Sequence, residues 1–73
     1  MDIKQNVGLR IRQLRKQLAI SQEALALKAD VDRTYVTDVE AGRRNVSLEI
    51  LERLIKALNT SFTEFFNHKD FRK

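Results

Sequence analysis

The chain has 73 residues, which is enough for one domain with a single small core and too short for two. It contains no cysteine, which excludes disulfides and thiolate metal sites, so association between copies is expected to add stability. Its 14 Lys and Arg against 10 Asp and Glu give a net charge of +4, which suits a polyanionic partner. No apolar run approaches the ~20 residues of a membrane span, and the N-terminus lacks the apolar core of a signal peptide. We therefore expect one cytoplasmic domain over residues 1–73 that has no contact with a membrane.

The first predicted helix runs from Ile3 to Leu18. Its apolar positions recur at steps of three and four residues, with charges between them, at Ile3, Val7, Ile11, Leu14 and Leu18. Gly8 weakens this helix by about 1 kcal/mol relative to alanine, but periodic positions remain on either side. Basic residues crowd the same segment, at Lys4, Arg10, Arg12, Arg15 and Lys16. Arg15 lies one turn after Ile11, on the inner side, where a guanidinium needs a partner.

Two short helices with a tight turn between them are predicted next. Ser21 is a good N-cap for a helix that starts at Gln22, in which Leu25, Ala26 and Ala29 form one small apolar face. Asp30 breaks that pattern, and Asp32 caps a second helix from Arg33 to Ala41. Gly42 closes the second helix, because glycine readily takes the left-handed conformation of a C′ residue.

The second of these helices has one buried and one polar face. At roughly 100° per residue, Val36 and Val39 turn inward and Glu40 lies beside them. The other side carries short polar or small side chains and a flanking arginine, at Arg33, Thr34, Thr37, Asp38 and Ala41. Such a face fits the major groove of DNA, where arginine bonds a guanine edge and threonine bonds a base or contacts a thymine methyl. An ordinary solvated helix face has the same character, and the helix alone does not separate the two interpretations.

The unit as a whole resembles the helix-turn-helix of the lambda Cro and repressor family, over about Val7 to Phe66. The residues that carry the resemblance are Arg15, the Ser21-Gln22 start, Leu25-Ala26, Val31, Val36 and the Glu40-x-Gly42 ending. Within the family, Asp32-Arg33-Thr34-Tyr35 followed by Gly42-Arg43-Arg44-Asn45 is most similar to the controller proteins of restriction-modification systems. The turn departs from the family pattern, which often has glycine where this chain has Asp30. Aspartate tolerates the left-handed region better than most residues, so the turn is expected to be kept.

Three further expectations concern the surroundings of the motif. Glu40 is the expected partner of Arg15, and the resemblance implies the same ion pair; the alternative is two side chains that reach separately to water. Arg43, Arg44 and Asn45 follow the outer helix, where guanidinium and amide groups bond phosphate oxygens, although a hydrophilic connector has the same composition. Gln22, in the first turn of its helix, is expected to contact phosphate too, as the resemblance also implies.

The last third of the chain is predicted to hold two more helices. Ser47 caps a core helix with Leu48, Leu51, Leu54, Ile55 and Leu58, and Asn59 ends it. Ser61 and Glu64 have capping-box spacing, and three phenylalanines follow on one face, Phe62, Phe65 and Phe66. These rings either pack in the core or share in a two-fold dimer contact, which we favour. Residues 67–73 lack a clear pattern and are expected to fray, although Phe71 has the character to dock on a partner.

The sequence therefore predicts an all-α, compact five-helix bundle of the lambda-repressor type, with the helix-turn-helix at helices 2 and 3. The predicted function is sequence-specific binding of double-stranded DNA by a homodimer that regulates transcription, with no cofactor, metal, small-molecule ligand or enzymatic activity. The predicted base contacts are Arg33, Thr34, Thr37 and Asp38, and the predicted backbone contacts are Gln22, Tyr35, Arg43, Arg44 and Asn45. Asp38 either accepts from a cytosine amino group or acts by excluding wrong sequences. The sequence leaves four kinds of protein as alternatives: a restriction-modification controller, a phage-type repressor, an antitoxin-like regulator and an interaction module that does not bind DNA.

Overall fold

The computed structural model describes residues 2–72, a stretch made of helices and connecting loops without a strand. The elements are α1 (Ile3–Gln17), α2 (Gln22–Ala29), α3 (Arg33–Glu40), α4 (Leu48–Ala57), α5 (Phe62–Phe66) and a 3-10 turn, η1 (Lys69–Phe71). The predicted five-helix, all-α fold is confirmed, with two predicted helix ends displaced by one residue. Within residues 2–72, none of the helices has the length and apolar character that a membrane crossing requires.

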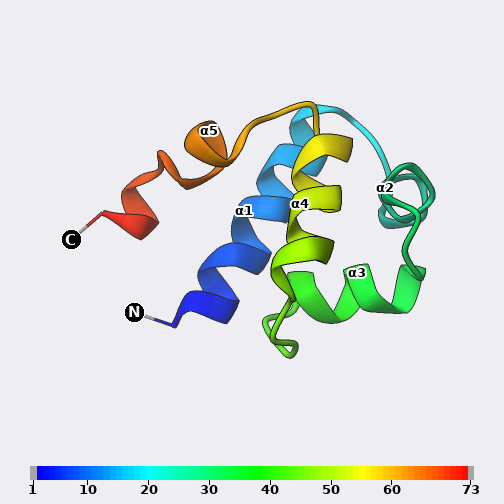
Figure 1. Cartoon of the computed structure of the whole chain (residues 1–73), viewed down its shortest axis with the longest axis horizontal. Helices are drawn as coiled ribbons and strands as arrows, with labels where there is room; N and C mark the ends of the chain where they lie inside the picture. The colour runs from blue at the N-terminus through cyan, green and yellow to red at the C-terminus, as the bar shows by residue number, and fades with distance from the viewer. Residues whose placement is uncertain (1, 73) are drawn as a thin grey trace.

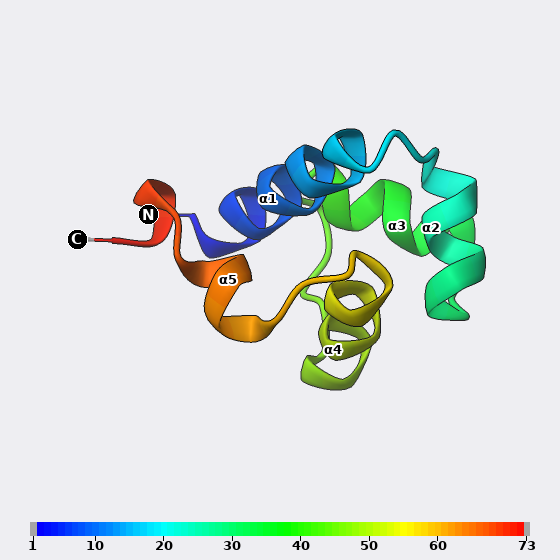
Figure 2. The same cartoon turned by 90° about the horizontal axis from the view of Figure 1, so that it is seen from above.

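The helix-turn-helix and the C-terminal segment occupy opposite ends of the molecule. α2 and α3 lie at one end of the long axis, and α5 with the last residues lies at the other, in both views (Figures 1 and 2). α1 packs against α3, and α2 packs against both α3 and α4. A surface built on α3 is therefore separate from one built on α5.

Side-chain caps fix where the helices begin. Each predicted cap accepts a hydrogen bond from an amide two or three residues along, over 2.9 to 3.2 Å, and these caps are Ser21, Asp32, Ser47 and Ser61. Asp2 does the same for α1 by accepting from the amides of Lys4 and Gln5, a cap that the sequence reading missed. Each cap satisfies one or two of the amides that a helix leaves free at its N-terminus.

The core gathers apolar residues from all five helices. Its fully buried members include Ile11, Leu25, Val36, Val39, Leu54, Ile55 and Phe65. Gly8 is buried where α1 crosses α3, and a Cβ on it would lie 2.3 Å from the carbonyl oxygen of Val39 and 2.8 Å from that of Glu40. Gly8 thus allows α1 to pack directly against the backbone of α3. From the sequence alone, Gly8 was expected only to lower the stability of its helix.

One member of the predicted dimer contact belongs to the core instead. Phe65 is 0% exposed, and its ring lies edge-on to that of Phe66 with centroids 4.9 Å apart. A partner subunit has no access to Phe65, so its predicted place in the interface is corrected. The helix that carries it is fastened from α1, because Arg10 donates to the carbonyl oxygens of Glu64 and Phe65 over 2.8 and 2.7 Å.

The C-terminal segment folds back on the same chain. In residues 67–73, where the sequence suggests a frayed end, the structure has the turn η1 and describes the chain as far as Arg72; Lys73 lies outside the described residues. The ring of Phe71 lies edge-on to Phe66, with centroids 4.9 Å apart, and Asn6 donates to the carbonyl oxygen of Asp70 over 3.3 Å. Phe71 therefore docks on its own subunit.

Candidate nucleic-acid interface

The turn between α2 and α3 has the geometry that the motif requires. Asp30 takes the left-handed conformation with φ +57°, in the position where the family often has glycine. The amide of Val31 donates to the carbonyl oxygen of Ala26 over 2.9 Å, which closes the end of α2. Asp32 then caps α3 at once, so the two helices are joined with little freedom between them.

The outer face of α3 lies open at the surface. Arg33 and Thr34 are exposed, Thr37 and Asp38 are partly exposed, and Val36 on the opposite side is fully buried. The predicted division between a buried and a polar face of this helix is therefore confirmed. The face carries hydroxyl donors and acceptors, a guanidinium and a carboxylate, which are the groups that read base edges in the major groove.

A polar network fixes α3 to α1 and α2. Arg15 donates to Glu40 through two nitrogens, over 2.6 and 3.0 Å, and the pair is nearly buried, so the expected ion pair forms. Gln22 donates to the same carboxylate over 3.0 Å, and its amide oxygen accepts from the hydroxyl of Thr37 over 3.0 Å. A bidentate charged pair with further hydrogen bonds holds one geometry more firmly than a single contact.

The network also stabilises the charge of the buried arginine. The hydrogen bond with Glu40 raises the pKa of Arg15 above its ordinary value, against burial, which lowers it, and the negative charge of Glu40 adds to the rise. Arg15 therefore stays charged inside the protein. Because its guanidinium is bound to Glu40, it is not available to bind a DNA phosphate. Gln22 and Thr37, both predicted to contact DNA, are linked to each other and only partly buried, so each keeps an exposed edge.

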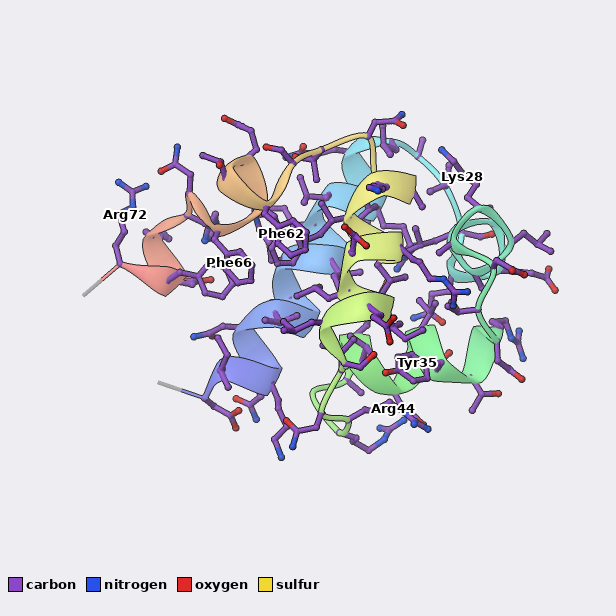
Figure 3. All side chains as sticks on the ribbon, viewed as in Figure 1. Lys28, Tyr35, Arg44, Phe62, Phe66 and Arg72 are labelled. Carbon is purple, nitrogen blue, oxygen red and sulfur yellow. The ribbon has the colours of Figure 1, made fainter. Side chains whose placement is uncertain are left out.

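The loop after α3 holds its two arginines close to that helix. Asp38 accepts from Arg43 over 3.0 Å and lies 3.6 Å from a guanidinium nitrogen of Arg44. The guanidinium carbon of Arg44 sits 4.3 Å from the centre of the Tyr35 ring, and Figure 3 shows Tyr35 at α3 with Arg44 next to it. The hydroxyl of Tyr35 accepts from the amide of Ser47 over 3.4 Å. The structure thus brings Tyr35, Asp38 and the loop arginines into one cluster.

The basic residues of α1 divide into two groups. Arg10 and Arg15 are bound within the chain, one to α5 and one to α3, so they do not belong to a free basic surface. Lys4, Arg12 and Lys16 are exposed. The basic cluster predicted on α1 therefore has fewer free cations than the composition of this helix indicates. The arginines nearest the face of α3 that is predicted to read bases are Arg33, Arg43 and Arg44.

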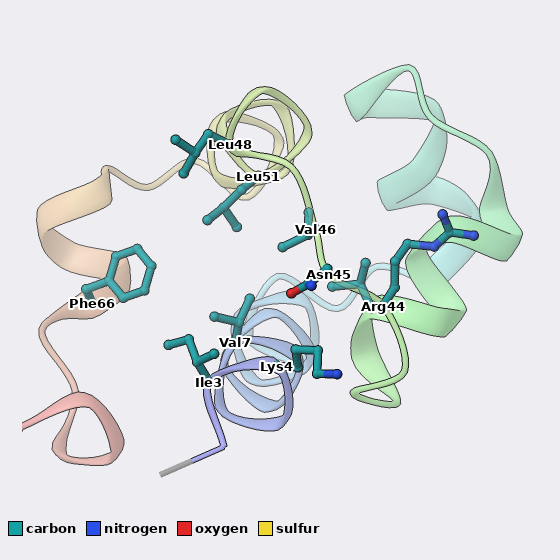
Figure 4. Close-up of a pocket in the computed structure, with 10 residues that line it drawn as sticks. Ile3, Lys4, Val7, Arg44, Asn45, Val46, Leu48, Leu51 and Phe66 are labelled. Atoms are coloured by element: carbon teal, nitrogen blue, oxygen red, sulfur yellow. The ribbon is translucent and has the colours of Figure 1, made fainter.

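A second surface is apolar, and we call it the α4–α5 apolar face: Ile3, Leu48, Phe62 and Phe66. Leu48, predicted to lie in the core, is instead 79% exposed, and Ile3 and Phe62 are 49% and 41% exposed. Ile3, Leu48 and Phe66 line a groove of about 200 Å³ (Figure 4). Its other lining residues include Val7, Val46 and Leu51, together with Lys4 and with Arg44 and Asn45 of the loop after α3. Exposed large apolar groups that share one face are typical of an interaction surface. The sequence had already singled out Phe62 and Phe66; Leu48 was missed because its spacing fits the buried stripe of α4.

Comparison with known proteins agrees with this geometry. A helix-turn-helix family model matches residues 11–65. Control protein C.MunI from Mycoplasma sp is 42% identical over 67 residues, which are 90% of this chain and 90% of that protein. The chain belongs to the helix-turn-helix family. As a member of that family it is similar to solved structures of restriction-modification controller proteins, as the sequence predicted.

Two of those structures show how far the likeness to other helix-turn-helix proteins extends. C.AhdI from Aeromonas hydrophila has a TM-score of 0.85 at 41% identity, over 90% of this chain and 100% of that one. The tetramer of C.Esp1396I in complex with its natural 35 base-pair operator has a TM-score of 0.81 at 35% identity, over 85% of this chain and 82% of that one. The helix-turn-helix match includes every residue predicted to contact DNA, from Gln22 to Asn45, whereas Ile3 and Phe66 of the α4–α5 apolar face lie outside it.

Proposed function

We propose that this protein is a transcriptional regulator that binds a specific sequence of double-stranded DNA as a homodimer, in the manner of a restriction-modification controller. The observation that carries the proposal is the exposed polar face of α3, fixed from behind by Arg15 and Glu40 and flanked by Arg43 and Arg44. Its membership of the helix-turn-helix family and its similarity to C.Esp1396I, which was solved with its operator, support the same reading. The proposal assigns no enzymatic step to the chain and places it in the cytoplasm with its DNA.

Each subunit would lay α3 in one major groove, with the two half-sites roughly one helical turn, about 34 Å, apart. Arg33 would bond a guanine, and Thr34 and Thr37 would complete the base contacts. Gln22, Tyr35, Arg43, Arg44 and Asn45 would meet the phosphate backbone and set the register of α3 in the groove. In this arrangement α3 selects the sequence, and the loop after it supplies most of the affinity.

A pair of substitutions separates these two roles. Arg33→Ala is expected to cost about 1–3 kcal/mol of binding free energy and to relax the preference at one base pair, because a bidentate base contact is lost. Arg44→Ala is expected to weaken binding to all sequences alike and to reduce the salt slope by about one, because a phosphate contact is lost. The measurement is binding to an operator selected from a random-sequence pool and to its single-base variants, at several salt concentrations.

Arg53→Ala serves as the control, because it removes the same charge from an exposed position on α4. It is expected to leave both sequence preference and salt slope nearly unchanged. A uniform loss of affinity in Arg33→Ala and Arg44→Ala would contradict the division of roles. If the parent protein bound no duplex even at low salt, DNA binding itself would be rejected in favour of an interaction module that kept the fold.

A further inference from the structure

Asp38 places a negative charge on the surface that the proposed function presents to a polyanion. It lies on the last turn of α3, on the same side as Thr34, and it is partly exposed. Its two carboxylate oxygens face two different arginines, one oxygen 3.0 Å from Arg43 and the other 3.6 Å from Arg44. The carboxylate therefore joins the helix proposed to read bases to the loop proposed to bind phosphate.

The loop has a second set of restraints, which does not depend on this carboxylate. The amide of Arg43 donates to the carbonyl oxygen of Asp38 over 3.0 Å, and the guanidinium of Arg44 lies over the ring of Tyr35. The backbone of the loop and the position of Arg44 on Tyr35 would survive the loss of one charge. The carboxylate in addition neutralises the charge of the two guanidinium groups and orients them toward α3.

Phosphate and the Asp38 carboxylate compete for the same donors. Both are anions that accept from guanidinium groups, so Arg43 and Arg44 must leave or share Asp38 before they bind the DNA backbone. Non-specific complexes depend almost entirely on phosphate contacts, so they bear the whole cost of this exchange. A specific complex has base contacts in addition, which hold α3 and the loop after it in one register on the duplex. In that register the two arginines can meet phosphates while they still share Asp38, so the specific complex bears less of the cost.

We infer that Asp38 is a positioning residue that holds Arg43 and Arg44 against α3 and sets sequence selectivity by withholding these two cations from random DNA. This inference rests on the proposed function, since it concerns how the same surface distinguishes an operator from other duplexes. Asp38 acts through the two arginines, so its effect depends on their presence. A direct base contact by Asp38 would be independent of them, and this difference decides between the two roles.

The test is Asp38→Asn, which keeps the shape of the side chain and removes its charge. Binding is measured to a duplex of random sequence and to the selected operator, at two salt concentrations that differ fourfold. We expect the variant to bind the random duplex more tightly, with a salt slope steeper by up to about one, so that the lower salt widens the difference between the two proteins by up to about fourfold. Affinity for the operator should rise less, so the ratio of operator to random affinity falls.

Two comparisons make the result specific to this cluster. Glu52→Gln makes the same change in net charge at an exposed position on α4, 3.8 Å from Lys56, and should leave the ratio unchanged. In a protein that carries Arg43→Gln and Arg44→Gln, adding Asp38→Asn should no longer alter the ratio. Thermal unfolding of each variant establishes that it is folded at the temperature of the binding measurements.

Several outcomes would overturn the inference. One is an equal fall in affinity for both duplexes, which would make Asp38 a support for the loop alone. Others are a ratio that changes as much in Glu52→Gln, or an effect of Asp38→Asn that persists without the two arginines. A change of preference confined to one base pair would identify Asp38 as a base contact instead. In each of these cases the parent still binds DNA, whereas failure of the proposed function would leave the parent without affinity for any duplex.

Discussion

Ala19 has a backbone conformation that its side chain disfavours. In the described part of the chain, three residues other than glycine have positive φ, Ala19 at +57°, Asp30 at +57° and Asn59 at +58°. Aspartate and asparagine tolerate this region because their short polar side chains bond locally, whereas alanine has only the clash of its Cβ. The loop between α1 and α2 therefore stores strain that the other two positions largely avoid.

Ala19→Gly is expected to stabilise the protein. Removing the Cβ relieves about 1–2 kcal/mol of left-handed strain, and the greater freedom of glycine in the unfolded chain takes back roughly 0.4–1 kcal/mol, leaving a net gain of about 0–1.6 kcal/mol. The net gain is measured as the difference in the free energy of unfolding between the variant and the parent, from urea denaturation. Asn59→Gly is the matched control and should gain less, because asparagine already accepts this conformation; a loss of stability in Ala19→Gly would show that its Cβ makes contacts worth more than the strain.

The close crossing of α1 over α3 requires a residue without a Cβ at position 8, although glycine is unfavourable inside a helix. Glycine is unfavourable there by about 1 kcal/mol relative to alanine, so local helix propensity alone predicts that Gly8→Ala stabilises α1. The added Cβ would fall 2.3 Å from the carbonyl oxygen of Val39, which is backbone and cannot rotate away. The two helices must separate to make room, which disturbs the core beneath them and the position of α3.

Gly8→Ala is therefore expected to destabilise the protein despite the better helix former, by about 1–3 kcal/mol, as overpacking of a core does. Unfolding in urea measures the loss, and operator affinity should fall as well, because α3 no longer holds its place relative to the loop. Gln17→Ala, an exposed change at the end of the same helix, should stay within about 0.5 kcal/mol of the parent. Unchanged or higher stability in Gly8→Ala would mean that the crossing has room that the structure does not show.

How much of the fold the sequence predicts depends on the range of the interaction involved. The caps at Ser21, Asp32, Ser47 and Ser61 were predicted correctly because a cap and the amide it bonds are two or three residues apart. The sequence did not predict which phenylalanine is buried, Phe65, or that Leu48 is exposed, because both depend on how α4 and α5 lie against α1.

The same contrast holds within the candidate site. The two faces of α3 follow from its own periodicity, and the pairing of Arg15 with Glu40 follows from two inward positions together with the family resemblance. The clamp from Arg10 to the end of α5 joins residues more than 50 positions apart, and only the folded chain reveals it. The contacts of Asp38 with Arg43 and Arg44 depend on the path of the loop after Gly42, which hydrophobic periodicity does not predict.

The molecule has two surfaces of different character. The face of α3 is polar and flanked by arginines, whereas the α4–α5 apolar face presents Leu48 and Phe62 to solvent. Figures 1 and 2 place α5 at the opposite end of the long axis from α2, so a partner seated on α5 would leave the helix-turn-helix uncovered. A small domain without disulfides gains stability from such an association, and a two-fold dimer would present two copies of α3 to one duplex.

The α4–α5 apolar face is therefore expected to form the dimer contact, and the double variant Leu48→Glu with Phe62→Glu should abolish it. Burying two carboxylates without partners opposes association, so sedimentation should show a monomer at concentrations where the parent is a dimer. Affinity for a single half-site should change little, while affinity for the full operator falls roughly 10²-fold or more, because the second α3 is no longer held at high effective concentration.

Leu27→Glu provides the control, because Leu27 on α2 is 78% exposed, almost the same as Leu48, and lies outside this face. It should leave the parent's association unchanged, since a charge added to a surface that stays in water costs little. Equal weakening by Leu27→Glu would mean that added negative charge, and not the apolar face, governs association. If the double variant remained a dimer with full operator affinity, the contact would have to lie elsewhere, although the reading of DNA by α3 would stand.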